Sequence, residues 1–260
     1  MHYRAAYPTN EHERAARRLV EFFSAVPVAE AVLLVCSCAR GRASRDSCLD
    51  AAVLVRPEVF PQEKDALEQQ WNAFWEGDDA FASLRQVGKF SDVHLDFIDG
   101  CFVPQKRGPT GGPDGFELAI GNYVAYSTPL WERGDLFRRL KERWLPYYDE
   151  WLRERRLAMV RHYCLNNLDH IPLYVERGLH FQAFNRLYDA HREFLQALFI
   201  ARRTYPIAYD KWIQEQIVDI LEMPALYRTL VRLFEIEHLE SDEIARKAEV
   251  LRGLVAQYAV

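Results

Sequence analysis

The stretch Val35-Cys36-Ser37-Cys38-Ala39-Arg40-Gly41-Arg42-Ala43-Ser44-Arg45-Asp46-Ser47-Cys48-Leu49-Asp50 joins two apolar runs, residues 31–35 and 49–55. Both runs are rich in branched aliphatic residues and predict buried strands. Small residues between them let the backbone approach a bound anion closely, and the Ser37 hydroxyl with successive amide N–H groups can hold phosphate oxygens. Asp50 opens the second strand, where its carboxylate can hold a divalent cation. We therefore expect a polyphosphate site at this turn.

This stretch resembles the signature of the DNA polymerase β superfamily of nucleotidyltransferases, in which a Gly-Ser pair precedes two carboxylates at alternate positions of a strand. The matching positions are Ser37, Ala39, Gly41, Ser47 and Asp50. The resemblance covers residues 29–99, and the helical second half is similar to that of the minimal members that modify small molecules, such as the kanamycin and lincosamide nucleotidyltransferases. It implies an α+β fold: a small mixed-sheet nucleotidyltransferase domain over residues 1–134, then an all-helical bundle domain over residues 135–260.

The resemblance also implies a metal site for Mg²⁺ or Mn²⁺, because members of the family hold two ions with three carboxylates. The third carboxylate comes from a later strand, where Asp96 is the match and Asp99 the substitute. Asp50 and Asp96 are thus the expected catalytic and metal-binding pair, with Cys48 as a further metal ligand.

The nucleoside triphosphate, as substrate, would be bound by residues of the turn and by one residue of the helical half. Ser37, Cys36 and Ser47 lie in the turn. Lys211 is the fourth candidate, because in related helical domains a Tyr-Pro turn and a nearby Lys-Trp pair face the nucleotide. A helix-terminal charge beside a packed indole is the alternative interpretation of Lys211.

Two cysteines depart from the family pattern. Cys36 stands in place of glycine, and Cys48 in place of the first paired aspartate. A thiol is a soft ligand whereas Mg²⁺ prefers oxygen, so Cys48 cannot replace a carboxylate at equal strength. Three outcomes are open: one metal on Asp50 and Asp96 supports slow turnover, Asp46 substitutes for the missing carboxylate, or the protein binds nucleotide without transferring it.

The expected reaction moves a nucleoside monophosphate, AMP from ATP, to a hydroxyl of a small-molecule acceptor. A general base would help to remove the hydroxyl proton, and Glu117, Asp99 and His94 are the candidates. The alternative is a catalytically degenerate nucleotide-binding or interaction protein of the same fold. Modification of a protein or RNA partner is a third hypothesis.

Two other patterns favour packing over chemistry. Four thiols, those of Cys36, Cys38, Cys48 and Cys101, could in principle hold zinc, but their spacing is typical of no zinc module. Arg186 and His191 match the Arg-x4-to-6-His pattern of HEPN ribonucleases. Five residues turn an unbroken helix by about 140°, so the two side chains would not share a face. His191 lies on an apolar stripe, and we expect it to be packed in a core or an interface.

Periodicity and turn residues predict the remaining elements. Helices are expected over 10–23 and 62–75, further strands over 93–98 and 122–127, the last as part of a hairpin, and a mobile loop over 104–115. From residue 135 onward all elements are expected to be helical, over 136–144, 147–166, 171–177, 180–203, 209–220, 224–234 and 242–256.

Composition limits the partners. The 260 residues carry 33 Lys and Arg against 38 Asp and Glu, a net charge of -5, which speaks against nucleic acid. No apolar run reaches the roughly 20 residues that span a bilayer. The charged start of the sequence lacks a signal peptide, and five cysteines, an odd count, favour reduced thiols, so we expect a cytoplasmic protein without a membrane partner. A homodimer is left open.

Overall fold

The structure is a computed structural model that describes residues 4–260. The chain divides into two compact units. The first consists of Met1–Val103 and Ala119–Leu145, and the second of Pro104–Leu118 and Pro146–Val260. Residues 1–3 of the predicted first domain lie outside the described part.

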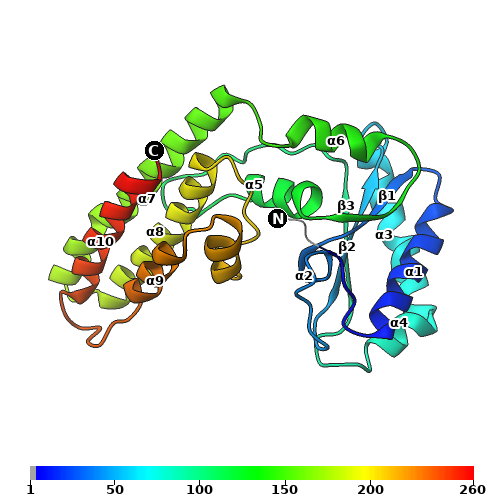
Figure 1. The fold of residues 1–260 in the computed structure, drawn as a ribbon, viewed down its shortest axis with the longest axis horizontal. Coiled ribbons are helices and arrows are strands. Elements are labelled where there is room, and N and C mark those ends of the chain that lie inside the picture. The colour runs from blue at the N-terminus through cyan, green and yellow to red at the C-terminus, as the bar shows by residue number, and fades with distance from the viewer. Residues whose placement is uncertain (1–3) are drawn as a thin grey trace. The chain divides into compact units, whose positions relative to one another are not determined.

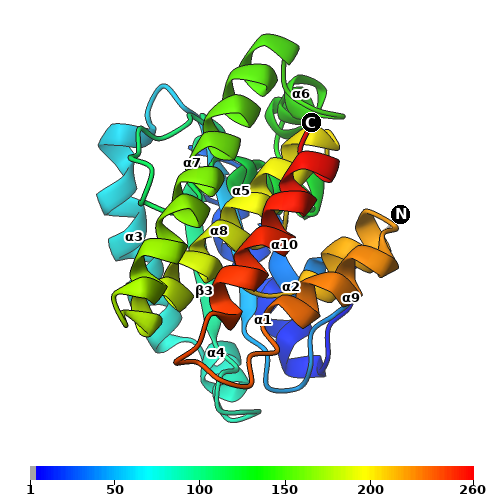
Figure 2. The ribbon, with the colours of Figure 1, turned by 90° about the vertical axis from the view of Figure 1, so that its left-hand side faces the viewer.

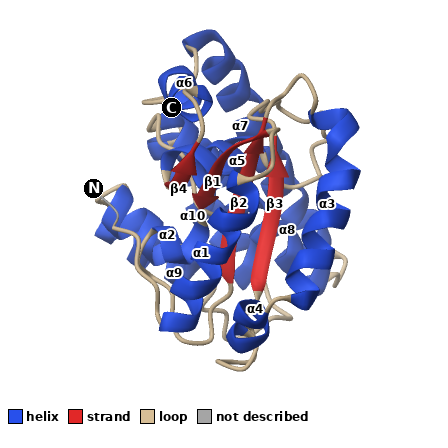
Figure 3. Cartoon of the chain, turned by 90° about the vertical axis from the view of Figure 1, so that its right-hand side faces the viewer, coloured by secondary structure: helices blue, strands red, loops and turns tan. Residues whose placement is uncertain are grey.

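The first unit is built on a four-stranded sheet of order β3-β2-β1-β4 (Figure 3). The strands are β1 (Ala29–Leu34), β2 (Leu49–Val55), β3 (Val93–Ile98) and β4 (Thr128–Glu132). β1 is antiparallel to both β2 and β4, whereas β2 and β3 are parallel. The sheet is therefore mixed, as predicted, and the fold is α+β.

One face of this sheet is covered by α1 (Asn10–Ser24), α3 (Phe60–Gly77) and α4 (Asp79–Leu84) (Figure 1). Alternate strand residues such as Leu49, Ala51 and Val53 pack there against aromatic side chains, including Phe23 and Trp71. The pleat of a strand sends the residues between them to the opposite face. Two further helices of this unit are the short α2 (Cys36–Ala39) and α6 (Leu136–Trp144).

The predicted strand over 122–127 and its hairpin are wrong. These residues continue α5 (Phe116–Ile120) into a π-helix, η1 (Gly121–Ala125), and the strand β4 follows it. β4 pairs with β1, at the opposite edge of the sheet from β3. Pro129 lies within β4, and a proline without an N–H is tolerated there because β4 is an edge strand.

The second unit is helical, and its long helices α7 (Glu150–Glu176), α8 (His180–Ala201) and α10 (Glu243–Tyr258) pack together (Figure 2). The segments predicted as two helices, 147–166 and 171–177, form the single helix α7 with Pro172 inside it. The shorter elements are η2 (Glu215–Ile220) and α9 (Pro224–Leu233). The helix predicted over 209–220 begins only at Ile213 and continues as η2 from Glu215, because Gln216 binds backbone groups of Ile207, Ala208 and Lys211 in the preceding turn.

The segment predicted as a mobile loop lacks regular structure but is fixed by buried ion pairs within the second unit. Arg107 donates to Glu193 and Gln196, and Arg156 donates to Asp114 and Glu117. The side chains of Arg156, Asp114 and Glu117 are 3%, 1% and 0% exposed. Each buried charge has a partner of opposite sign, which is the condition for burying it at all.

Among residues 4–260, no helix is both long and apolar enough to cross a membrane.

Candidate functional site

The sheet face opposite α1, α3 and α4 carries a group of polar side chains from β2, β3 and the residues before them. Asp50 in β2 is paired with His94 in the parallel strand β3, and Ala52 is paired with Asp96. Paired residues of neighbouring strands project from the same face, and so do alternate residues of one strand. Cys48, Asp50, His94 and Asp96 therefore share one face.

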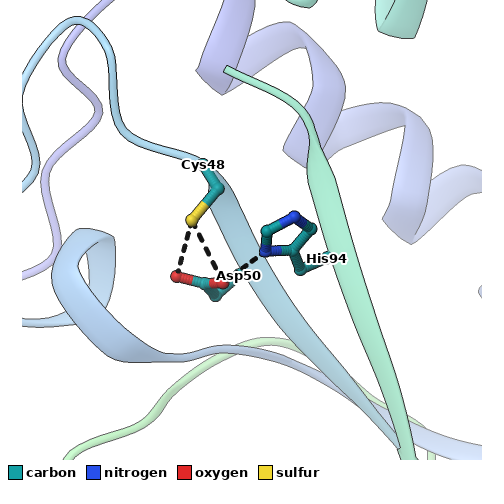
Figure 4. A group of neighbouring side chains, drawn as sticks. All are labelled: Cys48, Asp50 and His94. Carbon is teal, nitrogen blue, oxygen red and sulfur yellow. Dashed lines mark hydrogen bonds and ion pairs between the residues drawn. The ribbon is translucent and has the colours of Figure 1, made fainter. Parts of the chain in front are cut away.

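Asp50 lies at the centre of this group (Figure 4). The thiol of Cys48 is 3.3 Å from both oxygens of the Asp50 carboxylate, and His94 Nδ1 is 3.4 Å from Asp50 Oδ1. One sulfur, one oxygen and one nitrogen atom all lie within 4.8 Å of one another. The Asp50 side chain is 19% exposed and that of His94 is 68% exposed, so solvent or a ligand can reach the group.

Asp96, the predicted third carboxylate, has a different partner. It is exposed, and its Oδ2 accepts a hydrogen bond of 2.9 Å from the hydroxyl of Tyr123 in η1. Burial, together with the nearby charge of Asp96, raises the pKa of Tyr123 well above its ordinary value. The phenol therefore stays protonated and donates to Asp96. π-helical segments such as η1 are frequent at functional sites.

The turn after β1 begins beside Asp50. The Val35 amide donates to the carbonyl of Asp50 at 3.0 Å, and the chain then turns sharply at Cys36, whose φ of 54° is in the left-handed region. Ser37, 8% exposed, follows in α2. A positive φ at a non-glycine residue is costly and is concentrated at functional sites. The structure thus brings Cys36 and Ser37 next to the strand that carries Asp50.

No family model matches the chain, and no curated protein matches it. Solved structures do. One is a nucleotidyltransferase-like protein from Exiguobacterium sibiricum 255-15, which is 16% identical, with a TM-score of 0.46; the match covers 94% of this chain and 74% of that one.

Ser47 and Lys211 are the other two residues predicted to bind the nucleotide. The Ser47 hydroxyl is engaged in its own turn, where it accepts from the Ser44 amide at 2.9 Å. Lys211 is exposed and belongs to the second unit. Asp46, the suggested substitute carboxylate, lies against Gly88, so close that a Cβ at position 88 would clash with it.

Of the three candidate bases, His94 is the one on the Asp50 face. Glu117 is fully buried in the second unit, where its carboxylate accepts from Tyr148, Arg156 and Gln196. Those bonds saturate it, so it is a structural residue and not a general base. Asp99 follows the end of β3 and accepts from the Cys101 amide at 2.8 Å.

The four-thiol zinc site is not formed. In the part of the chain that the structure describes, no group of three metal ligands includes Cys36, Cys38 or Cys101. Cys38 is buried, and burial raises the pKa of its thiol to about 12, with further contributions from Asp50 and Cys48. A thiol that stays protonated is a poor metal ligand.

The Mg²⁺ ions that the resemblance implies do not fit the donor atoms present. Mg²⁺ prefers an octahedral shell of oxygen atoms. Here a single carboxylate, that of Asp50, is grouped with sulfur and nitrogen, and Asp96 is hydrogen-bonded to Tyr123. His94 is the ligand that the sequence did not indicate as such, because its pairing with Asp50 depends on the register between β2 and β3.

Proposed function

We propose that the protein binds a nucleoside triphosphate at the turn of Cys36 and Ser37, and transfers its nucleoside monophosphate, AMP when the substrate is ATP, to a hydroxyl of a small molecule. The observation that carries the proposal is the hydrogen bond between Val35 and Asp50. It sets the turn that resembles a polyphosphate-binding signature against the face that carries Asp50, His94 and Asp96.

The described residues offer a role for each requirement of such a transfer. The Ser37 hydroxyl and the amides of its turn would hold phosphate oxygens, since closely spaced N–H groups form anion-binding concavities. His94 would take the proton of the attacking hydroxyl at Nε2, because its other nitrogen, Nδ1, faces the carboxylate of Asp50. A carboxylate at Nδ1 fixes the orientation of the ring.

The proposal is tested by calorimetric titration with ATP and by pyrophosphate release in the presence of a panel of small hydroxyl compounds. Ser37→Ala should weaken ATP binding by at least about tenfold, because a hydrogen bond to a charged group contributes about 1.5–3 kcal/mol. Ser44→Ala is the matched control, since Ser44 is exposed in the same connection and its hydroxyl faces Ser47. Failure of the unmodified protein to bind ATP would overturn the proposal.

A second candidate function is nucleotide binding without transfer, and Cys48 is the observation that favours it. The thiol occupies the position of a carboxylate and donates to the one that remains, Asp50. ATP binding without pyrophosphate release would support this candidate. Restored release in Cys48→Asp would then identify the missing carboxylate as the cause, whereas no gain would assign the limit to another residue.

A further inference from the structure

The donor atoms around Asp50 are those of a borderline-soft cation. Cys48 offers sulfur, Asp50 oxygen and His94 an imidazole nitrogen. Zn²⁺ binds all three ligand types in proteins, whereas Mg²⁺ binds oxygen and keeps much of its water. Cys48, which makes the site unfavourable for Mg²⁺, therefore makes it suitable for zinc.

The spacing of these atoms agrees with a tetrahedral ion. At tetrahedral angles, zinc bonds of about 2.0–2.2 Å to nitrogen and oxygen place those two atoms about 3.3–3.5 Å apart, and a bond of about 2.3 Å to sulfur places sulfur and oxygen about 3.5–3.7 Å apart. The Cys48 Sγ to Asp50 Oδ distances are both 3.3 Å, and the distance from His94 Nδ1 to Asp50 Oδ1 is 3.4 Å. The edge from His94 to Asp50 thus already has the length that zinc requires, and the edge from Cys48 to Asp50 is shorter than required by a few tenths of an ångström.

The backbone holds the three ligands from adjacent parts of one sheet. Asp50 and His94 are paired across the parallel strands β2 and β3, and Cys48 precedes Asp50 by one pleat. The Cys48 carbonyl lies 3.9 Å from the Cys38 thiol, and the Ser47 carbonyl accepts from His12. The chain that leads into the site is therefore held in place, and little ordering is needed on binding.

We propose that Cys48, Asp50 and His94 form a zinc-binding site with three protein ligands. Three ligands leave the fourth position of a tetrahedral ion open, as in zinc sites that bind water or substrate. On the basis of the proposed function, that position takes a phosphate oxygen of the nucleotide. For the ion to bind, Nδ1 of His94 and the Cys48 sulfur would release their protons to solvent, and the remaining ring proton would lie on Nε2. His94 would then not act as a base, so the zinc-loaded site corresponds to nucleotide binding without transfer.

The test uses the full chain, stripped of metal and titrated with Zn²⁺, Mg²⁺ and Co²⁺ in the absence of nucleotide. We expect one Zn²⁺ per chain, retained in the presence of excess Mg²⁺. Co²⁺ should produce the intense near-ultraviolet charge-transfer band of thiolate coordination. Cys48→Ser should abolish that band and weaken Zn²⁺ binding by at least about tenfold, and His94→Gln should weaken binding similarly.

Cys101→Ser is the matched control, because Cys101 is an exposed thiol of the same unit outside the group. Cys48→Asp provides a second variant in which the ligand is exchanged and not removed; it should lose affinity for Zn²⁺ and gain it for Mg²⁺. The proposal is overturned if Zn²⁺ binding is unchanged in Cys48→Ser and His94→Gln, or if Cys101→Ser alone reduces it.

A parallel ATP titration separates this inference from the proposed function. Zinc bound by Cys48 and His94 in a chain that does not bind ATP would retain the metal site and refute nucleotide binding. ATP binding that depends on Ser37, in a chain with no zinc affinity, would support nucleotide binding and refute the metal site. Tighter ATP binding with Zn²⁺ than without it would support both, since coupling between two ligands is reciprocal.

Discussion

Gly41 shows how a single residue fixes the turn between β1 and β2. Its φ is 68°, and a Cβ built at this position would lie 2.8 Å from the carbonyl oxygen of Arg4. The position therefore excludes a side chain both by conformation and by the approach of another backbone segment. The Gly41 amide also donates to the carbonyl of Cys38, which closes the short helix that holds Ser37.

Gly41→Ala should lower the free energy of unfolding by about 1–3 kcal/mol, because alanine must either adopt a strained φ or displace residue 4. Gly77→Ala is the matched control, since Gly77 ends a helix, a Cβ built there would meet open space, and its φ is outside the left-handed region. Urea unfolding followed by circular dichroism measures both. Equal losses in the two variants would contradict the role assigned to Gly41.

At the candidate site, the contacts between side chains could not be predicted from the sequence. The roles of Asp50 and Asp96 were implied by the family resemblance, and alternation placed His94 with Asp96 on one face. The sequence could not show that Asp50 lies opposite His94, because the register between parallel strands depends on packing of the whole sheet. Tyr123 was placed in a strand, and its bond to Asp96 was therefore missed.

Helix α8 is the central element of the second unit. Its residues from Glu193 to Ile200 are all buried, and one of its buried side chains, His191, lies against the ring of Phe234 at 5.0 Å between centroids. The prediction of a packed histidine is confirmed, and Arg186 instead donates to Asn167. Burial, with a smaller contribution from the charge of Arg192, lowers the pKa of His191 to about 4.

This pKa predicts a loss of stability in mild acid. The unfolded histidine titrates near its ordinary value of 6.5, so between pH 6.5 and 4 the unfolded state binds more protons than the folded state. Stability is complete above pH 6.5 and declines as the pH falls toward 4. At pH 5 the loss is about 2 kcal/mol, from 1.36 kcal/mol per pH unit.

Urea unfolding of the helical unit at pH 7 and pH 5 would measure this loss. His191→Gln should be less stable at pH 7 but lack this pH-dependent part. His162→Gln is the control, because His162 is exposed on α7 and should leave the pH dependence unchanged. A pH profile that is the same in all three proteins would refute the assignment to His191.

Elements with strong local signals were predicted best. The strands 49–55 and 93–98 and the helix 136–144 agree with β2, β3 and α6, because each has a clear local pattern, an apolar run in the first and a periodicity in the other two. Residues 122–127 include Tyr and Val, which favour strands, yet they continue a helix that begins at Phe116. The start of η2 depends on a side chain, Gln216, that binds the turn before it, and no local pattern reveals such a contact.

At the scale of the whole molecule, the buried network around Arg156 organises the second unit. Arg156 donates to Asp114 and Glu117, and Gln196 donates to the same two carboxylates. Burial raises the pKa of Asp114, but the hydrogen bonds and charge of Arg156 outweigh it and hold that pKa below its ordinary value. The Gly and Pro residues of 104–115 predicted a mobile loop. The sequence alone does not show that charges distant in the chain pair there, so the ordering of this loop was not predicted.

Arg156→Met should destabilise the second unit by about 3–5 kcal/mol, because it leaves two buried carboxylates without their cation. Amide hydrogen exchange should accelerate over residues 104–118 and over α7 and α8, and much less over β1 and β2. Arg155→Met is the matched control, since Arg155 is the exposed neighbour on the same helix. Equal acceleration in both variants, or none in Arg156→Met, would refute this role.

The division of the chain has a consequence for its synthesis. The polypeptide leaves the first unit at Pro104, re-enters it at Ala119 and departs again at Pro146. On the ribosome, Arg107 emerges long before Glu193 and Gln196, so residues 104–118 must wait for α8 to be translated before their charges are neutralised. For the same reason, no single truncation of the chain yields two complete units. A fragment ending at Leu145 would contain the charges of Arg107 and Asp114 without the side chains that pair with them.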